Sequence, residues 1–458
     1  MASETYSAST AEGHAIELSS GTASYENIEV YKTGDGNDSN GSEYYDWYGR
    51  NAAILATGGT LTITQAYISS DATYGSAVFA YGSSAKIVIS ESSIETGKKN
   101  SGGIMVTGGG TISADNLTIT TSEGSSAAIR SDKNGGTITV NEGTYTANGA
   151  GSPAVYSTAD ITVSNAELNS GIAQGVVIEG KNSATLNNCT VNASHTTKNG
   201  QDSTYQAVMI YQSGSGDADE GTSSFAMTNG SITNANGDIF CVTNTSCTID
   251  LTNVEITNSD TSGNFLRAEA QAWGTSGSNR GTVVLTASSQ DISGNVIVDS
   301  SSSLTMTLKD NSTFTGSFNP DTTSTASLFN LSAATGGAIS VTVEEGSKLT
   351  LTGNSYITYL SVADSSDIDY GVYTLNVDGT EYSEDDPADG EVGDPSATPS
   401  GSGSGSNNDT TNNDTTNDDT TTNNNTAGVG SSSSGCNAGY MGLTALLAGV
   451  AFLLKKKN

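Results

Sequence analysis

A spacing of 23 to 26 residues recurs along much of this chain, and it constrains the fold more than any other feature of the sequence. The recurring unit is a polar residue followed three positions later by an apolar one, as in Gln65 and Ile68. The polar member returns at Glu91, Asn116, Glu142, Asn165 and Asn188, and after longer steps at Asn229, Asn253, Ser289, Asn311 and Asn354. Repeats that bury their apolar faces only against their neighbours predict a solenoid, here of about a dozen coils.

Each repeat contains three short apolar runs, and Gly, Asn or Ser separates one run from the next. One repeat has them at 104–106, 111–113 and 117–119. Runs of this length with alternating β-branched residues are typical of strands, and Gly-Gly pairs such as 58–59 are typical of turns. Three strands in a coil of about 24 residues predict an all-β solenoid, with three parallel sheets around a narrow core.

The composition agrees with a thin, strand-rich molecule. Only 34% of the 458 residues are hydrophobic, against roughly 45–50% in ordinary globular domains, so one thick core is not expected. The 54 glycines and the abundant Ser and Thr argue against a helix-rich enzyme. The net charge of −33 repels polyanions, so we expect no nucleic-acid partner.

The repeat pattern resembles the right-handed parallel β-helix family over about residues 15–362. That family includes pectate-lyase-like and polygalacturonase-like enzymes, phage tailspikes and adhesin-like surface proteins. The recurring asparagines resemble the stacked turn asparagines of the family, whose side-chain amides bond from coil to coil; they are Asn116, Asn165, Asn188, Asn229, Asn253, Asn311 and Asn354. The resemblance implies a fold and leaves the activity open, because one fold hosts many functions.

Catalytic signatures of the polysaccharide-cleaving relatives do not appear in the sequence. Asp-Asp pairs occur at 385–386 and 418–419, outside the repeats, and His195 stands alone between repeats. A lyase would need an Arg or Lys base, and we interpret the mid-repeat candidates as solvated surface charges; these are Arg130, Lys133 and Lys181. We therefore predict no catalytic residues. The alternative is a polysaccharide lyase or glycoside hydrolase whose catalytic residues follow another pattern.

The insertion at 33–50 concentrates aromatic and acidic side chains in a chain with only 6% aromatic residues. Aromatic faces beside carboxylates are suited to stacking on sugars and accepting their hydroxyl hydrogen bonds. The predicted ligand-binding residues are Tyr44, Tyr45, Trp47 and Tyr48, joined by Trp273 from a second insertion that we expect to be exposed. The competing interpretation is that the aromatic residues of 33–50 cap the open N-terminal end of the solenoid.

The same insertion offers alternating oxygen ligands of a kind that calcium prefers, at Asp35, Asn37 and Asp38. The run departs from the EF-hand pattern, which has Gly at its sixth position and Glu at its twelfth. Calcium is the one cofactor that we consider. A solvated loop is the competing interpretation, for this run and for the acidic insertion at 216–220.

Three of the four cysteines fall in the repeats and the fourth near the C-terminus. We interpret Cys189, Cys241 and Cys247 as small core residues, with a bridge between the last two left open. Cys436 begins a tail with an apolar run at 440–454 and three terminal lysines. This tail resembles bacterial Gly-Cys C-terminal sorting signals, which implies processing near Cys436 and surface attachment. A plain membrane anchor is the alternative.

These observations divide the chain into three parts. Residues 1–382 form the predicted β-helix with loop insertions, 383–435 an acidic, disordered Asn/Asp/Thr/Ser/Gly spacer, and 436–458 the anchoring tail. From 401 to 435 the apolar side chains are Ala427 and Val429, too few for a core. The first residues lack a secretory signal, which we interpret as a truncated or trimmed start. We predict a monomeric, adhesin-like, non-catalytic protein of the bacterial cell surface that contacts extracellular glycans or other surfaces.

Overall fold

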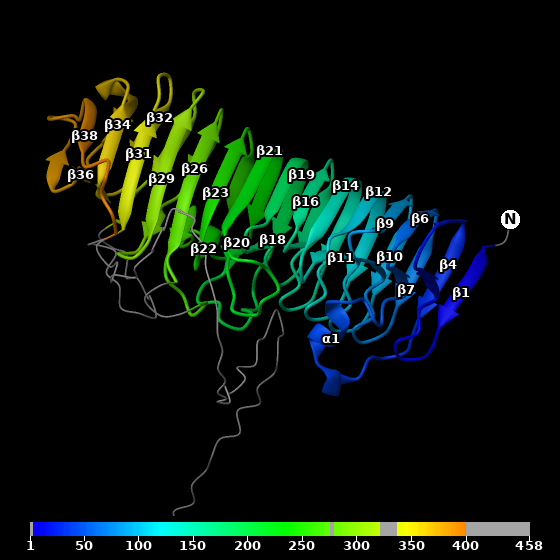
Figure 1. The fold of residues 1–458 in the computed structure, drawn as a ribbon. Helices are drawn as coiled ribbons and strands as arrows, with labels where there is room; N and C mark the ends of the chain where they lie inside the picture. The colour runs from blue at the N-terminus through cyan, green and yellow to red at the C-terminus, as the bar shows by residue number, and fades with distance from the viewer. Residues whose placement is uncertain (1–2, 275–278, 321–336, 400–458) are drawn as a thin grey trace, which may run out of the picture.

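The computed structural model describes residues 3–274, 279–320 and 337–399. Within these ranges the fold is all-β and is built mainly from parallel sheets, as the sequence predicts. Figure 1 shows the strands lying side by side in one long array, from β1 near the N-terminus to β36 and β38 at the other end. The helical residues described are the short helix α1 (Ser42–Asp46) and the 3-10 turns at Asp38–Asn40 and Ser365–Asp367. This arrangement is consistent with a β-helix.

One sheet contains eleven parallel strands in the described residues. Each strand pairs with the strand of the preceding repeat, so Ile54 lies beside Val78, and Val78 beside Ile104. Equivalent residues of successive repeats therefore stack in columns. The strands are β2 (Ile16–Leu18), β5 (Ile54–Ala56), β8 (Val78–Tyr81), β11 (Ile104–Thr107), β13 (Ile129–Ser131), β15 (Val155–Ser157), β18 (Val176–Glu179), β20 (Gln206–Tyr211), β22 (Asp238–Thr243), β25 (Leu266–Ala268) and β28 (Val296–Val298).

A second, twenty-stranded network is parallel except at its last pair, and it contains two rows of strands. Long strands join the rows, since β12 pairs with β9 through its first half and with β10 through its second. The strands are β1 (Glu4–Ala8), β3 (Thr22–Glu26), β4 (Ile28–Lys32), β6 (Gly59–Thr64), β7 (Tyr67–Ser70), β9 (Ala85–Ser90), β10 (Ser93–Thr96), β12 (Gly110–Thr121), β14 (Gly136–Ala147), β16 (Asp160–Ser164), β17 (Glu167–Ser170), β19 (Ser183–Ala193), β21 (Thr222–Asn234), β23 (Thr245–Thr252), β24 (Glu255–Asn258), β26 (Gly281–Ser288), β29 (Ser303–Lys309), β31 (Ala338–Val343), β34 (Tyr359–Val362) and β38 (Gly390–Gly393).

Two smaller sheets complete the C-terminal half. The first contains β27 (Asp291–Ser293), β30 (Thr313–Gly316), β32 (Lys348–Leu351) and β35 (Ile368–Asp369), all parallel. The second contains β33 (Ser355–Ile357), β36 (Leu375–Val377) and β37 (Thr380–Tyr382). Its last pair is antiparallel, as is the pair of β34 with β38. The parallel array therefore ends in antiparallel strands.

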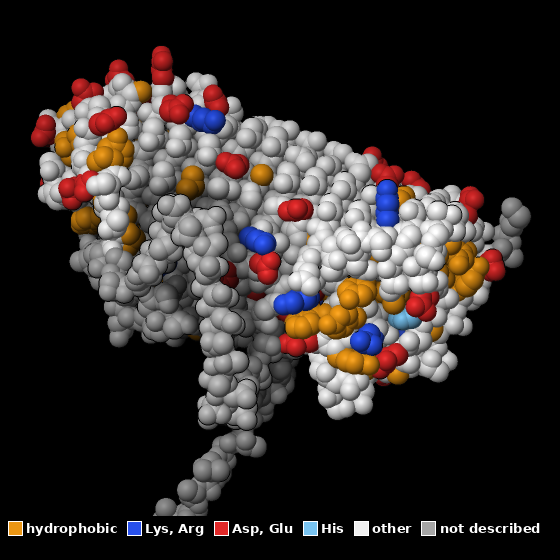
Figure 2. Space-filling view, viewed as in Figure 1, with side chains coloured by type: hydrophobic (Ala, Val, Ile, Leu, Met, Phe, Trp, Pro, Cys, Tyr) orange, Lys and Arg blue, Asp and Glu red, His pale blue; other side chains and the backbone are white. Residues whose placement is uncertain are grey.

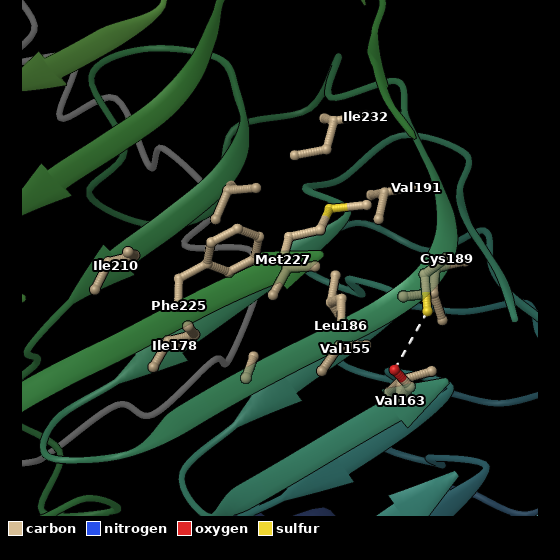
Figure 3. Close-up of a cluster of buried hydrophobic side chains, with 14 of the residues drawn as sticks. Val155, Val163, Ile178, Leu186, Cys189, Val191, Ile210, Phe225, Met227 and Ile232 are labelled. Carbon is tan, nitrogen blue, oxygen red and sulfur yellow. Dashed lines mark hydrogen bonds between the residues drawn. The ribbon is translucent and has the colours of Figure 1, made fainter. Parts of the chain in front are cut away.

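One continuous apolar core runs between the sheets from Ile16 to Ala388. Alternation along the strands fills it, because successive residues of a strand point to opposite faces. In β9, for example, Ala85, Ile87 and Ile89 are buried and the residues between them are not. Figure 3 shows side chains from successive repeats meeting in this core, including Ile178, Leu186 and Phe225.

The recurring polar residue of each repeat occupies a left-handed turn. Gln65, Glu91 and Asn116 have φ of 55°, 50° and 50°, and the equivalent residues through Asn311 are also positive. Asparagine tolerates this region better than most residues. The turn asparagines bond from repeat to repeat, as the resemblance implies: Nδ2 of Asn188 donates to Asn165 at 3.2 Å, and Nδ2 of Asn229 donates to Asn188 at 3.0 Å.

The first part of the predicted spacer belongs to the folded body. Strand β38 pairs with β34, and Val392 of β38 packs against the core. Ala388 is buried, and its backbone N–H donates to the Tyr370 hydroxyl at 2.9 Å. Strand pairing, a backbone hydrogen bond and two apolar side chains therefore place a segment that its composition assigns to the spacer. No helix in the described ranges has the length and apolarity needed to cross a membrane.

Candidate functional site

The outward face of the eleven-stranded sheet is covered, and it contains several buried charged side chains, among them Arg130 and Glu179. Phe79, Met105, Arg130, Tyr156 and Met209 all point outward from this sheet, yet all are buried. Loop insertions lie over them, among them the segment around α1, which Figure 1 shows beside the strands and away from the N-terminus. The aromatic residues that the sequence predicts as a binding site lie on or beside this loop-covered face.

The insertion at 33–50 lies along the side of the array, so the interpretation that it caps the N-terminal end is wrong. The Tyr45 ring is buried and stacks on Tyr74, with 4.7 Å between the ring centroids. Asp35 accepts a hydrogen bond from the Thr73 backbone N–H at 2.8 Å, and the Thr107 hydroxyl donates to the Trp47 carbonyl at 2.8 Å. These partners belong to later repeats, which places the insertion over the flank of the sheet.

The predicted ligand-binding aromatic residues divide into covered and open ones. Tyr45 is fully buried. Trp273 is also buried, contrary to the expected exposure, and contacts Tyr211. Trp47 donates its indole N–H to Asp217 at 3.0 Å. Tyr44 and Tyr48 flank the exposed guanidinium of Arg50 at 4.5 and 5.1 Å. Figure 2 shows apolar and basic side chains gathered around α1. We call Tyr44, Tyr48 and Arg50 the tyrosine–arginine patch.

Arg130 is a buried ion-pair residue, so its interpretation as a solvated charge is wrong. Its guanidinium lies 2.9 Å from Asp46 and 3.1 Å from Asp132. Burial raises the pKa of Asp46, and it raises the pKa of Asp132 more strongly. The negative charge of the nearby Asp217 is the second cause of the raised pKa of Asp132. Asp217 is itself buried, although the sequence predicted a solvated loop there. The reason is that the loop at 216–220 folds over Arg130 and Trp47.

Lys133 and Lys181, the two lysines that the sequence analysis considered together with Arg130, lie near the surface. Lys181 is exposed and contacts Asp219 at 2.9 Å, which agrees with a solvated charge. Lys133 donates to the Gly216 carbonyl, and its ammonium lies 5.0 Å from the centre of the Trp47 ring. Both lysines therefore help to hold the acidic loop against the sheet.

Glu179 lies deeper under the same loop and is fully buried. Its carboxylate accepts hydrogen bonds from the hydroxyls of Tyr156, Tyr211 and Ser213, the second at 2.9 Å. Burial raises the pKa of this carboxyl group, and the Ser213 bond opposes the rise. The hydroxyls satisfy the carboxylate from inside the protein, so Glu179 fastens the loop and offers nothing to solvent.

His195 is buried, although the sequence suggested an isolated loop residue. Its Nδ1 accepts from the Gln206 backbone N–H at 3.1 Å, and Nε2 lies 3.2 Å from the Thr197 carbonyl. These contacts assign the neutral tautomer with the proton on Nε2. Burial lowers the pKa of His195 to about 4 and raises that of the nearby Asp202 to about 6. Both groups are covered by loops.

The proposed calcium ligands are already bonded within the protein. Asp35 accepts the Thr73 backbone N–H, as described above, and the side-chain oxygen of Asn37 accepts the Ser39 backbone N–H at 3.0 Å. Asp38 accepts from the Tyr74 hydroxyl at 3.0 Å and contacts Lys99 at 2.9 Å. Lys99 lowers the pKa of Asp38. In the part of the chain that the structure describes, no group of three or more His, Cys, Asp or Glu side chains could hold a metal ion.

The three cysteines of the repeats are buried and free. Cys189 and Cys247 lie in the core, as predicted, whereas Cys241 lies on the loop-covered face in register with Met209, where Gln271 contacts it. No bridge joins Cys241 to Cys247. Cys189 donates to the Val163 carbonyl at 3.3 Å, as Figure 3 shows. Cys436 lies outside the described residues.

A groove that the sequence analysis missed lies on another side of the array, between β24 and β27. It has a volume of about 660 Å³ and is lined by Gly230, Asn253, Val254, Glu255, Ile256, Ser289, Asp291, Ile292, Ser293, Thr313 and Thr315. Glu255 and Asp291 are exposed carboxylates. The sequence contains one sign of this groove, which is the long polar side chain of Gln290 directly after the turn residue. In the other repeats this position has a small or apolar residue, as at Ala66, Ser92 and Val254.

Comparison with known proteins adds no family. No family model matches the chain, and neither a curated protein nor a solved structure matches it. Inferences about function therefore rest on the residues described above.

Proposed function

We propose that this chain is a non-catalytic, adhesin-like right-handed parallel β-helix, with three strands per coil and about a dozen coils. In this proposal the acidic spacer separates it from a bacterial envelope, and the C-terminal tail attaches it there. The parallel registers between successive repeats and the bonded turn asparagines support the β-helix. The sequence of the spacer and tail supports the surface location.

One observation carries the non-catalytic part of the proposal. The charged side chains of the loop-covered face are buried and bonded to one another, as at Arg130 with Asp46 and Asp132. A general acid or base must reach the proton that it transfers. Side chains enclosed in this way hold loops in place, which suits a rigid scaffold that displays a surface.

The tyrosine–arginine patch is the part of the predicted aromatic site that could contact a glycan. Tyr48 is 38% exposed. Aromatic rings can stack on the apolar face of a sugar, while a guanidinium donates several hydrogen bonds in a fixed geometry. We propose that glycan contact on the loop-covered face involves Tyr44, Tyr48 and Arg50. The covered Tyr45 and Trp273 are not part of this contact.

A glycan array with the full chain tests the proposal, because binding and cleavage can be measured on the same panel. We expect binding without release of reducing ends or unsaturated products. Tyr48→Ala should weaken binding at the patch and leave the melting temperature nearly unchanged. Tyr45→Ala should lower the melting temperature, since truncating a buried aromatic residue costs about 3–5 kcal/mol. Absence of glycan binding would remove this function.

The alternative function is a polysaccharide-cleaving enzyme, and the groove between β24 and β27 is what favours it. Glycoside hydrolases use two carboxyl groups, and Glu255 and Asp291 line the same groove. The alternative would be established if the full chain releases cleavage products and if Glu255→Gln or Asp291→Asn abolishes that release. Glu167→Gln is the matched control, because Glu167 is an exposed glutamate of β17, a strand paired on both sides.

A further inference from the structure

On one side of the array, the strand ladder of the described residues is interrupted between β24 and β27. β24 pairs with β21, and β27 pairs with β30, but no pairing joins β24 to β27 within the described ranges. On the other two sides the same repeats remain paired, through β23 with β26 and β25 with β28. An unpaired strand edge presents backbone N–H and C=O groups. The groove therefore lies at a local opening between repeats that are otherwise in contact.

Gln290 explains why the ladder opens there. In some other repeats the residue after the turn is a serine. The hydroxyl of one of them, Ser92, accepts the Ala66 backbone N–H of the preceding repeat at 3.0 Å. Ser312 does the same for the Gln290 backbone N–H at 3.0 Å.

At the opening, the Gln290 side-chain amide takes that role and bonds both backbone groups of Val254, at 2.7 Å each. A glutamine amide lies two carbon atoms further from the backbone than a serine hydroxyl. The buried Gln290 therefore holds Val254 at a distance that β24 and β27 cannot bridge with backbone hydrogen bonds.

The chemistry of the lining restricts what the groove can hold. It combines the carboxylates of Glu255 and Asp291 with hydroxyls such as Thr315 and with the partly exposed Ile256. None of the lining residues is Lys, Arg or His. Phosphate, sulfate and uronate groups would therefore meet two negative charges without compensation. The volume of about 660 Å³ falls within the range of roughly 300–1,000 Å³ that is usual for small-ligand sites.

We propose that this groove binds a segment of an uncharged oligosaccharide and that Gln290 keeps it open. Sugar hydroxyls donate to the carboxylates and accept from the backbone N–H groups of the open edge, while the apolar face of a ring covers Ile256. The site deepens the proposed glycan-binding function and rests on it.

An extended peptide fits this opening less well. A strand inserted between β24 and β27 would need two inter-strand spacings, about 9.6 Å. The same two repeats stay paired at a single spacing on their other sides. Widening the opening that far would break those pairs.

The test uses the full chain with Gln290→Ser, which places at the opening the short serine contact that Ser92 and Ser312 make in their repeats. The probes are the neutral hexasaccharides of glucose and mannose, with tri-galacturonate as the acidic comparison, and binding is measured by calorimetry. We expect Gln290→Ser to weaken neutral-sugar binding by at least about tenfold. Hydrogen exchange of the amides in 255–258 should slow, because β24 gains a partner. Slower exchange also shows that the variant is folded.

Charge variants give an independent measurement. Glu255→Gln and Asp291→Asn should each weaken neutral-sugar binding several-fold, while Glu167→Gln should not change it. Unchanged neutral-sugar affinity in Gln290→Ser with slowed exchange would overturn the site but leave glycan binding elsewhere on the chain intact. Preferential binding of tri-galacturonate, or failure to bind any neutral hexasaccharide, would overturn the proposed ligand class.

Discussion

At the scale of single residues, the notable feature is that polar groups are buried in partnered clusters. Arg130 lies among Asp46, Asp132 and Asp217, while Glu179 receives three hydroxyl donors. A buried charge persists only when it is paired and hydrogen-bonded, because losing its hydration is costly. These clusters join segments far apart in sequence, so each one fixes a loop to the sheet.

Removing the cation of the Arg130 cluster should therefore destabilise the protein. Arg130→Met leaves the buried carboxylates without their counter-charge, and breaking such a pair typically costs about 3–5 kcal/mol. Denaturant unfolding followed by circular dichroism measures the loss. Lys86→Met is the matched control, since Lys86 is exposed on β9 and its change should stay within about 0.5 kcal/mol. An equal effect of the two substitutions would show that the cluster contributes no stability.

His195 should make stability depend on pH. Its pKa is about 4 in the folded protein, below the ordinary value of 6.5, so between these values the unfolded chain binds the extra proton. The contribution of His195 is complete above pH 6.5 and is lost as the pH falls toward 4, by about 3 kcal/mol.

The comparison with His195→Asn isolates this contribution, because the amide oxygen can still accept the Gln206 N–H, and Asp202 is present in both proteins. The difference in unfolding free energy between wild type and variant should shrink from pH 7 to pH 4.5. A difference that does not vary with pH would contradict the lowered pKa.

At the scale of elements, the left-handed turn between the two rows of strands in the twenty-stranded network sets the repeat. Its residue has a positive φ in successive repeats, and its side chain bonds to the same position in the neighbouring repeat. The strands on either side are short, so the turn decides where each one begins. Gln290 illustrates this control, since a longer side chain beside one turn accompanies the opening between β24 and β27.

Substitutions at Asn188 separate the two roles of the turn residue. Asn188→Gly keeps the left-handed conformation and removes the side-chain bonds to Asn165 and Asn229, which should cost about 1 kcal/mol. Asn188→Ala removes the same bonds and adds the strain of a β-carbon at φ 53°, roughly 1 kcal/mol more. Urea unfolding of both variants measures their free energies of unfolding, and we expect the glycine variant to be the more stable of the two. Alanine tolerated as well as glycine would show that the backbone conformation is unimportant.

At the scale of the whole molecule, charge and attachment can be tested together on the envelope. The sequence has a net charge of −33, an acidic segment before the apolar run at 440–454, and lysines at 455–457 after that run. In the proposed function this order corresponds to a displayed body, a spacer and an anchor.

Processing near Cys436 is the corresponding prediction. Intact mass of the surface-attached protein should show a C-terminus close to Cys436, and Cys436→Ser should change that mass or release the protein. A surface form that retains 455–457 would instead identify the tail as a plain membrane anchor.

The sequence alone determined the all-β class, the repeat and its turn residues, because a local pattern repeated many times dictates both strand alternation and stacking. Ile54, Val78 and Ile104 are predictable as a column for that reason. The tertiary structure decided which loop residues are covered. Arg130, Asp217 and Trp273 sit in segments with surface-like composition, and only the folding of distant insertions over one sheet buries them.

The opening beside Gln290 also belongs to the tertiary structure, because it depends on the distance between two repeats that are 36 residues apart. Local propensity contains no information about contacts at that separation.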